Sequence, residues 1–228
     1  MTEPRSLSER LAKLPPGRHL VPSDYVAENQ RQRILAAVAE LVGERGYQKT
    51  TIELIAKTAR VALVTFYEHF DGKEDCFLAA FDESIAAARE VFAELLDMEQ
   101  PWQEQVSSGL QIFLEMVIRE RERAQLCIVE SQAAGSAGLA RYQAMLESVA
   151  PKLREGREFN PRAALLPDGL EVALAGGIAW LVHQRLMADD VDDLMTLLPE
   201  MLQVTLTPYV GEVEAGRAAD AAQARVAA

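Results

Sequence analysis

The chain has 228 residues, of which 49% are apolar and 25% charged, and its formal net charge is −12. No apolar run approaches the roughly 20 residues that span a bilayer, and the N-terminus has no apolar signal segment, so we expect neither a membrane protein nor a secreted one. The acidity is uneven: residues 1–75 carry 11 Lys and Arg against 11 Asp and Glu, so this part can still present a basic face to nucleic acid.

Apolar residues recur at helical spacing along nearly the whole chain, and alternating β-type runs between hairpin turns are lacking. This pattern predicts an all-α fold of about nine helices. Residues 1–22 are polar and contain a Pro-Pro-Gly step, which forbids a helix there, so we expect a flexible N-terminal arm. A first long helix is expected from Ser23, a suitable N-cap, to Gly46, a suitable residue for the position after a helix end.

Two short helices are expected after this first helix. The segment TTIELIAKTA begins with Thr50-x-x-Glu53, which has the spacing of a capping box. The segment LVTFYEHF follows a short turn, so the two helices have the form of a helix-turn-helix. Residues 23–72 are therefore predicted to form one small helix-turn-helix domain.

The second short helix has two chemically different sides. Val61, Phe66 and Phe70 are expected to pack inward. The residues expected to point outward or along the rim are Leu63, Val64, Thr65, Tyr67 and His69. Aliphatic and threonine methyl groups can contact a thymine methyl group, and Tyr or His can donate to phosphate, so this surface suits a DNA groove. On spacing alone an ordinary amphipathic helix remains the alternative, as does a buried, satisfied histidine for His69.

An ordered series of motifs runs through residues 31–81. It consists of Ile34-Leu35-x-Ala37, Gly46-Tyr47, Thr50-Thr51, Ile55-Ala56, Val61, Thr65-x-Tyr67-x-His69-Phe70 and Lys73-Glu74. In these motifs the segment resembles the N-terminal domain of the TetR family of bacterial transcriptional regulators. The all-helical remainder fits the ligand-binding and dimerisation domain of that family by architecture only.

The resemblance implies a set of DNA contacts. Thr51 would offer its hydroxyl to phosphate, and Lys73 would bind phosphate at the positive start of the next helix. Leu63 and Val64 would set sequence preference, unless they pack against neighbouring helices. For Arg18 a free, solvated arm is an equal alternative. The full set of residues placed in the DNA interface is Arg18, Arg31, Thr50, Thr51, Arg60, Ala62, Leu63, Val64, Thr65, Tyr67, His69 and Lys73.

Two residues depart from the family pattern at the turn. Arg60 stands where the family usually has glycine, and a positive φ at a non-glycine residue costs on the order of 1 kcal/mol. Ala62 stands where the family usually has serine, and the loss of a side-chain cap typically costs about 1 kcal/mol. Arg60 also adds a cation beside the DNA backbone, which offsets part of the loss.

Helical periods continue after the box-like start Asp71-x-x-Glu74, first as one long helix and then as a bundle. The resemblance implies that residues 73–210 form the ligand-binding and dimerisation domain. After Gly211 the residues are small and polar, and residues 211–228 are predicted to be disordered.

The middle helices of the expected bundle mix apolar and polar residues in a way that suits a small-molecule cavity. The candidate lining residues are Trp102, Phe113, Met116, Val117, Cys127, Glu130, Tyr142 and Met145. An ordinary core position is the alternative for each of them. Glu130 is the most informative, because a buried carboxylate needs a partner, either an arginine or a ligand.

The segment LEVALAGGIAWLVHQRL is too apolar for a helix that lies on a surface. Its two adjacent glycines each cost roughly 1 kcal/mol of helix propensity, which is tolerated where another backbone comes close. We expect a two-fold homodimer through this helix and the next, which places two reading helices on the half-sites of a palindrome. The residues expected near the seam are Ala173, Gly176, Gly177, Trp180, Leu181, Leu198 and Leu202.

Enzyme chemistry finds no support in the sequence, and no cofactor is expected. The three histidines, His19, His69 and His183, do not cluster with carboxylates or cysteines at metal-ligand spacing. A P-loop, a nucleophile elbow and a dinucleotide fingerprint are all lacking. Cys76 and Cys127 lie in apolar helical patterns, as buried thiols of a reducing cytoplasm do, so a cytoplasmic protein is expected.

These features together predict a ligand-responsive, dimeric transcriptional repressor. A small molecule in the C-terminal bundle would tilt the long helix that follows the reading helix and change the spacing of the two reading heads. The expected partners are double-stranded operator DNA, a small-molecule effector and a second copy of the chain, without a membrane. The alternative is a helical dimeric interaction protein of the same fold with weakened or lost operator binding, which Arg60 and Ala62 motivate.

Overall fold

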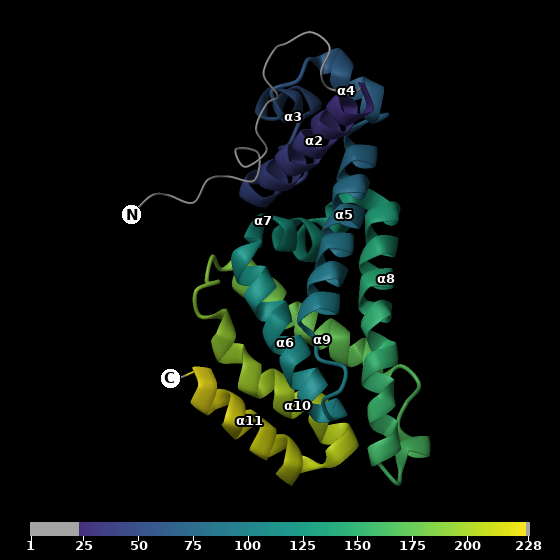
Figure 1. Cartoon of the computed structure of the whole chain (residues 1–228), viewed down its shortest axis with the longest axis vertical. Coiled ribbons are helices and arrows are strands. Elements are labelled where there is room, and N and C mark those ends of the chain that lie inside the picture. Colours follow the sequence, from purple (N-terminus) through teal and green to yellow (C-terminus); the bar gives the residue numbers. More distant parts are fainter. Residues whose placement is uncertain (1–22, 227–228) are drawn as a thin grey trace. The chain divides into compact units, whose positions relative to one another are not determined.

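The computed structural model describes residues 23–226, which form ten α-helices, α2 to α11, joined by short 3-10 and π-helical turns and without a strand in that range (Figure 1). The predicted all-α class is therefore confirmed. The described chain divides into two compact units. Unit 1 comprises residues 23–84 and 122–139, and unit 2 comprises residues 85–121 and 140–226.

Unit 1 is built around α2, Ser23–Arg45, on which α3 (Ile52–Thr58) and α4 (Leu63–His69) pack. Residues 34–39 of α2 are all buried, because other elements of the unit enclose the middle of this helix. The core of the unit gathers the apolar residues that the helical period places inward, namely Ile34, Val38, Val42, Ile55, Phe66, Phe70 and Phe77. The inward packing expected for Phe66 and Phe70 is thus confirmed, and Val61 is half-buried.

The ends of α2 and α3 follow local backbone chemistry. Gly46 has φ +83° and ends α2, as predicted. The N-cap of α3 is Thr51, whose hydroxyl oxygen accepts the backbone N–H of Leu54 at 3.3 Å. The expected capping box, Thr50 with Glu53, is therefore wrong by one residue, since the Thr50 hydroxyl instead donates to the carbonyl of Gly46 at 3.0 Å.

A segment distant in sequence completes unit 1. After the short helix α7, Arg121–Ala124, the chain makes a π-helical turn, Gln125–Val129, and a 3-10 turn, Ser131–Ala134, before α8 begins at Gly135. The segment is not one straight helix, because the consecutive residues Leu126, Cys127 and Ile128 are all buried and a straight helix could not turn all three toward one core. Residues 122–139 thus join the helix-turn-helix, although we expected the whole of residues 73–210 to form the other domain.

Unit 2 is organised around α10, Leu198–Val210, which packs on α6, Trp102–Arg119, and on α11, Glu212–Val226 (Figure 1). The other long helices with residues in this unit are α5 (Lys73–Leu95), α8 (Gly135–Arg154) and α9 (Leu170–Met187). Its most deeply buried residues include Leu114, Val182, Leu194, Leu198, Met201, Leu202, Leu206 and Tyr209. Among the helices of residues 23–226, none is long and apolar enough to cross a membrane.

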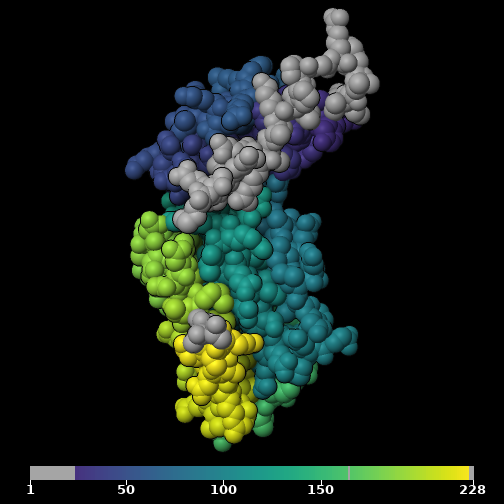
Figure 2. Space-filling view, turned by 60° about the vertical axis from the view of Figure 1, so that its left-hand side comes forward, coloured from purple at the N-terminus to yellow at the C-terminus, as the bar shows by residue number. Residues whose placement is uncertain are grey.

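The C-terminal residues form the helix α11, so the disorder expected for residues 211–228 is wrong for residues 212–226, while the last two residues lie outside the described chain. Ala215, Ala219 and Ala222 are buried at helical spacing, which gives α11 a narrow apolar stripe on the side that packs on α10. Figure 2 shows α11 in yellow at the surface of unit 2. Small residues looked like a solvated tail because each of them buries little area, although together they allow close helix packing.

A buried ion pair fastens the loop before α9. Arg157 donates from Nε and Nη2 to the two carboxylate oxygens of Glu171, at 2.6 and 3.0 Å, and Glu171 is fully buried. The same guanidinium donates to the carbonyl of Pro167 at 2.7 Å, and Tyr209 donates its hydroxyl to Glu171 at 3.3 Å. The hydrogen bonds from Arg157 hold the pKa of the Glu171 carboxyl below its ordinary value.

Candidate nucleic-acid interface

The outer side of α4 exposes apolar and aromatic side chains. Leu63, Val64 and Tyr67 are 43, 66 and 54% exposed, whereas Phe66 on the opposite side is fully buried. Thr65 and His69 are half-buried at the rim. The orientation expected for α4 is confirmed, and the helix offers a surface of methyl groups, a phenol and an imidazole.

The turn before α4 has the two weaknesses that the sequence predicts. Arg60 has φ +55°, which lies in the left-handed region, so the strain considered for a residue other than glycine at this position is present. Ala62 is the N-cap of α4, with φ −70° and ψ 153°, and it makes no side-chain cap hydrogen bond. The backbone of Ala62 already has the extended conformation that a serine cap uses, and only the hydroxyl is lacking.

Arg33 is a residue of this region that sequence reasoning missed. It lies on α2, is 5% exposed, and donates from Nη2 to the carbonyls of Ala59 and Arg60, the latter at 2.8 Å. Both carbonyls belong to the turn between α3 and α4. The only sequence signal was an arginine directly before the apolar Ile34-Leu35 step. This pattern is too common to identify an arginine that hydrogen-bonds to a turn 26 residues away.

The two threonines before α3 differ in their access to a phosphate. Thr51 is exposed, and as the N-cap its hydroxyl oxygen accepts a backbone N–H while its hydrogen remains able to donate. Thr50 is 1% exposed and donates to Gly46. The structure therefore contradicts Thr50 as a DNA contact, because its hydroxyl has neither access nor a free hydrogen, and Thr51 keeps its candidate role.

Lys73 stands in the first turn of α5 and is already held within unit 1. Its ammonium donates to the carbonyl of Tyr47 at 2.9 Å and lies 4.1 Å from the centroid of the Tyr47 ring. An ammonium has three hydrogens, so it can keep this contact and still donate to phosphate. The Tyr47 contacts would then fix where the positive charge of Lys73 stands.

Of the two arginines expected on the N-terminal side, Arg31 lies in the described part of unit 1. Arg31 has a half-exposed side chain, with Nη1 3.6 Å from the Glu83 carboxylate and its guanidinium 5.8 Å from the centroid of the Phe70 ring. It is therefore partly engaged within the unit, with surface left for a phosphate. Arg18 lies outside the described residues.

The π-helical and 3-10 segment is hydrogen-bonded to the loop between α2 and α3. The Glu130 carboxylate accepts the backbone N–H of Tyr47 at 2.8 Å, and the side-chain amide of Gln48 donates to the carbonyl of Ala133 at 3.3 Å. The backbone N–H of Tyr47 thus donates to Glu130, and the backbone carbonyl of Tyr47 accepts from Lys73. One partner of Glu130 is therefore a backbone N–H of the helix-turn-helix unit, and its role as a ligand contact stays a prediction.

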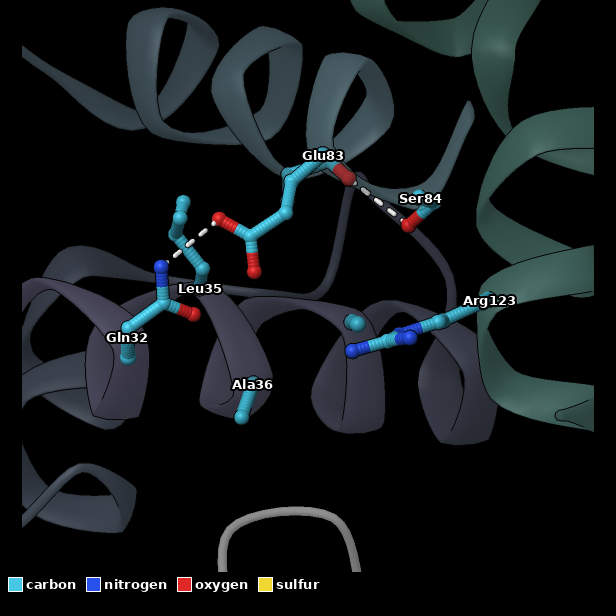
Figure 3. Close-up of a pocket in the computed structure, with 8 residues that line it drawn as sticks. Gln32, Leu35, Ala36, Glu83, Ser84 and Arg123 are labelled. Carbon is cyan, nitrogen blue, oxygen red and sulfur yellow. Dashed lines mark hydrogen bonds between the residues drawn. The ribbon is translucent and has the colours of Figure 1, made fainter. Parts of the chain in front are cut away.

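One shallow pocket in unit 1 lies between α2 and α5 (Figure 3). It is lined by Gln32, Leu35, Ala36, Ala39, Ala80, Glu83, Ser84 and Arg123. Gln32 donates across it to Glu83 at 3.1 Å, and its cavity volume of about 20 Å³ holds about one water molecule. This pocket is therefore too small for an effector.

The eight candidate effector residues do not gather in one unit. Cys127 and Glu130 belong to unit 1, and the other six belong to unit 2. The Cys127 thiol is buried, which raises its pKa to about 12 and makes it an unreactive core group. Their role as lining residues of an effector cavity stays a prediction.

Trp102 is also a structural residue. It is 6% exposed, donates its indole N–H to the carbonyl of Lys152 at 2.8 Å, and packs edge-on against Tyr209 with 5.2 Å between ring centroids. Gly156 lies against the ring so closely that a Cβ there would stand 2.4 Å from it. Val117 is buried as well, and the half-buried candidates that remain in unit 2 are Phe113, Met116, Tyr142 and Met145.

The candidate dimer residues separate into two groups. Ala173, Gly177 and Trp180 lie on the exposed side of α9, where Trp180 is 59% exposed, and Gly176 and Leu181 are half-buried. Leu198 and Leu202 are 1 and 0% exposed within the single chain. The structure therefore contradicts these two leucines as seam residues, because the packing of α10 on α6 and α11 has already buried them.

Residues 34–80 match the family model described as bacterial regulatory proteins, tetR family. This range runs from α2 through α3 and α4 into α5. Among curated relatives, the uncharacterized HTH-type transcriptional regulator YhgD of Bacillus subtilis (strain 168) is 27% identical over 121 residues, which are 53% of this chain and 61% of the relative. The match thus spans less than two thirds of that relative's length.

Two solved structures share the fold over most of the chain. The fatty acid degradation regulator FadR from Bacillus halodurans is 22% identical with a TM-score of 0.69, and the likeness covers 78% of this chain and 94% of that one. The transcriptional regulator FadR from Bacillus subtilis, solved in complex with stearoyl-CoA, is 21% identical with a TM-score of 0.61, covering 76 and 96%. At these identities the likeness establishes a common all-α fold.

Proposed function

We propose that this chain, whose residues 34–80 match the tetR family model, is a TetR-like transcriptional repressor that binds operator DNA and leaves it when a small molecule binds. The observation that carries the proposal is the outer side of α4. Leu63, Val64 and Tyr67 are exposed there, although burial in the chain's own core would stabilise them. An exposed apolar surface on a short helix that the core holds firmly is typical of a binding surface.

The reading surface is proposed to enter the major groove. Leu63 and Val64 would contact thymine methyl groups, and Tyr67 would donate to a phosphate or a base edge. Thr65 and His69, half-buried at the rim, would add backbone contacts.

Three groups around α4 are proposed to fix it on the DNA backbone. The exposed Thr51 hydroxyl would donate to one phosphate, and the ammonium of Lys73 at the start of α5 would bind another. Arg60 is exposed beside the start of α4 and would neutralise a third.

The exposed side of α9 is proposed to pair with the same side of a second copy about a two-fold axis. Ala173 and Gly177 carry little or no side chain, so the two helix backbones could approach closely around Trp180. A two-fold dimer would present two copies of α4 to the half-sites of a palindrome. A chain that sediments as a monomer at micromolar concentration would contradict this part of the proposal.

The effector is proposed to bind in unit 2 among the half-buried Phe113, Met116, Tyr142 and Met145. These side chains are mainly apolar with one hydroxyl, which suits an acyl chain with a polar end. A solved structure of the same fold contains stearoyl-CoA, so acyl-CoA thioesters are the first class to test.

The route from effector to DNA is proposed to run through residues 122–139. This segment follows α6 in the chain and leads into α8, both of which have residues in unit 2, yet its Glu130 holds the N–H of Tyr47. Tyr47 in turn holds Lys73. A shift of the segment would therefore move the loop before α3 and the phosphate-binding ammonium together. The effector would cause this shift if it bound the shifted state more tightly than the DNA-bound state.

A binding experiment tests the reading surface. Duplexes selected by the protein from a random library are titrated against unselected duplexes over a series of salt concentrations. We expect saturable binding with a preference for the selected duplexes, and Tyr67→Ala and Lys73→Ala should each weaken it. Weak binding without any preference for the selected duplexes would contradict the repressor and favour the alternative below.

A second experiment tests the effector and its route. Stearoyl-CoA and shorter acyl-CoAs are added to the complex with the selected duplex, and free coenzyme A serves as the ligand control. We expect release of DNA by an acyl-CoA, and we expect Glu130→Ala to bind the acyl-CoA but to respond less. Glu147→Ala, an exposed carboxylate of α8, is the matched control and should respond as the natural chain does.

The second candidate function is a dimeric interaction protein of the same fold with weakened operator binding. The positive φ of Arg60 and the uncapped Ala62 favour it, because both lower the stability of the turn that aims α4. The duplex titration distinguishes the two functions. A cytoplasmic location is part of the first proposal, because bacterial operator DNA lies there.

A further inference from the structure

The turn between α3 and α4 contains a strained residue at the point that sets the direction of the reading helix. Arg60 has φ +55°, a conformation that residues other than glycine rarely adopt. The next element, α4, has seven residues and begins at Ala62 without a side-chain cap. Local chemistry therefore does little to hold this turn, and the surrounding structure has to determine it.

Arg33 supplies such a tertiary contact from within the core. Its Nη2 donates to the carbonyl of Ala59, which ends α3, and to the carbonyl of Arg60 at 2.8 Å. These two carbonyls lie on either side of the backbone torsions of Arg60. Holding both of them with one rigid, planar group restricts those torsions, as a flexible ammonium would not.

The electrostatic setting of Arg33 is unfavourable in the free protein. Burial, and then the nearby charge of Arg60, lower the pKa of the Arg33 guanidinium, which nevertheless stays charged. Arg33 meets carbonyl dipoles and a second cation, whereas a phosphate beside the exposed Arg60 would compensate both charges. DNA binding would thus strengthen the arrangement that presents α4.

We propose that Arg33 is a positioning residue for DNA reading, which holds the left-handed Arg60 turn and thereby sets the orientation of α4 and of the Arg60 side chain. The proposal rests on the proposed DNA-binding function. It differs from a direct DNA contact, since Arg33 is buried and its guanidinium is already bonded to the turn. It also differs from general core stability, since its effect should depend on which residue stands at position 60.

A double-mutant cycle tests this dependence. The natural chain, Arg33→Met, Arg60→Gly and the double variant are titrated with a selected and an unselected duplex over a series of salt concentrations. Arg33→Lys is the conservative variant, since one ammonium can reach at least one of the two carbonyls. Thermal unfolding of the same proteins shows which variants are folded during the titration and supplies a second cycle without DNA.

We expect Arg33→Met to lower the ratio of selected to unselected affinity on the order of tenfold, because α4 loses its defined orientation. The slope of log affinity against log salt should not change, because Arg33 touches no phosphate. Arg60→Gly should retain the ratio and reduce the slope by about one, through loss of a phosphate contact. In the Arg60→Gly background, Arg33→Met should change the ratio by less than roughly threefold, since glycine adopts the turn unaided.

The opposite results are equally defined. Equal effects of Arg33→Met in both backgrounds would overturn the proposal, and so would a lower salt slope for Arg33→Met, which would make it a phosphate contact. If the natural chain shows no preference for its selected duplex, the proposed function fails and the role of Arg33 in reading fails with it. The thermal unfolding cycle then still tests whether Arg33 holds the Arg60 turn. If Arg33→Met lowers the melting temperature equally with Arg60 and with Gly at that position, this role is overturned as well.

Discussion

Two arginines, one in each unit, hold the backbone ahead of a helix that lacks a side-chain cap. In unit 1 Arg33 donates to the carbonyl of Arg60 before α4, and in unit 2 Arg157 donates to the carbonyl of Pro167 before α9. Neither helix start makes a side-chain cap hydrogen bond. Both starts therefore depend on a guanidinium that comes from another element.

The two arginines differ in the charge that they meet. Arg157 forms a two-pronged ion pair with the fully buried Glu171, so its charge is compensated within the chain. Arg33 meets two carbonyls, and the charge of Arg60 is close enough to lower its pKa. The ion pair of Arg157 stabilises unit 2, whereas the Arg33 guanidinium is held by two neutral carbonyls beside a second cation.

The largest effect is expected from breaking the compensated pair. Glu171→Gln should lower the free energy of unfolding by about 3 kcal/mol, because it leaves Arg157 without its carboxylate. Urea unfolding followed by circular dichroism measures this change. Glu158→Gln, at an exposed carboxylate next to Arg157 in the chain, is the control and should change little. A loss of less than about 1 kcal/mol for Glu171→Gln would show that the charge of Arg157 does not depend on the Glu171 carboxylate.

The same pair predicts a pH dependence. Arg157 lowers the pKa of Glu171 in the folded state, below its ordinary value of 4.5. The stabilisation is therefore fully present above pH 4.5 and is lost as the pH falls through the lowered folded-state pKa. The difference in unfolding free energy between the natural chain and Glu171→Gln should shrink in that acid range, and a constant difference would contradict the assignment.

The second largest effect is expected from adding the cap that α4 lacks. Ala62→Ser should raise the free energy of unfolding by about 1 kcal/mol, because the ψ of 153° already suits a serine that accepts the N–H of a first-turn residue. Thermal unfolding measures the gain, and the duplex titration should show tighter binding. An unchanged melting temperature would mean that Arg33 already holds this helix start as firmly as a cap does.

A smaller gain is expected from relieving the left-handed residue. Arg60→Gly removes strain of about 1 kcal/mol, and the greater freedom of glycine in the unfolded chain offsets part of it, so a net gain of roughly 0.5 kcal/mol is expected. Arg60→Met is the matched control, since it removes the charge and keeps the strain. If Arg60→Met is the more stabilising of the two, repulsion from Arg33 rather than backbone strain dominates this turn.

The smallest effect is expected at the start of α9. Gly169 occupies the cap position there with ψ 5°, a backbone in which a serine hydroxyl does not reach the first-turn N–H groups. Gly169→Ser should therefore change the free energy of unfolding by no more than a few tenths of a kcal/mol. A gain in the free energy of unfolding as large as that of Ala62→Ser would show that the backbone at both helix starts accepts a serine cap equally well. The two helix starts would then not differ in this respect.

Sequence patterns were reliable where the relevant interaction lies within one helical turn. The helical period placed Phe66 inward and Val64 outward, and glycine preferences anticipated the end of α2 at Gly46. The capping box was one residue off, because Thr50 and Thr51 are equally good caps locally. Only the packing of unit 1 buries Thr50 and leaves Thr51 at the helix start.

Patterns failed where the decision depends on a distant partner. Small residues alone could not show that Ala215 would be buried in a helix packed on α10, and an apolar period alone could not tell a dimer seam from the core around Leu202. Glu130 looked like a ligand contact because a carboxylate among apolar residues needs a partner, but that partner, the N–H of Tyr47, lies 83 residues away.

By itself the sequence determined the all-α class, the helix-turn-helix and the residues on the outer side of α4, because helical period, caps and turn residues act over a few positions along the chain. Only the tertiary structure decided that Arg33 would hold the carbonyl of Arg60 and that Glu130 would hold Tyr47. A buried charge and a strained turn are tolerated when packing brings a polar group to them, and sequence spacing does not reveal which group that will be.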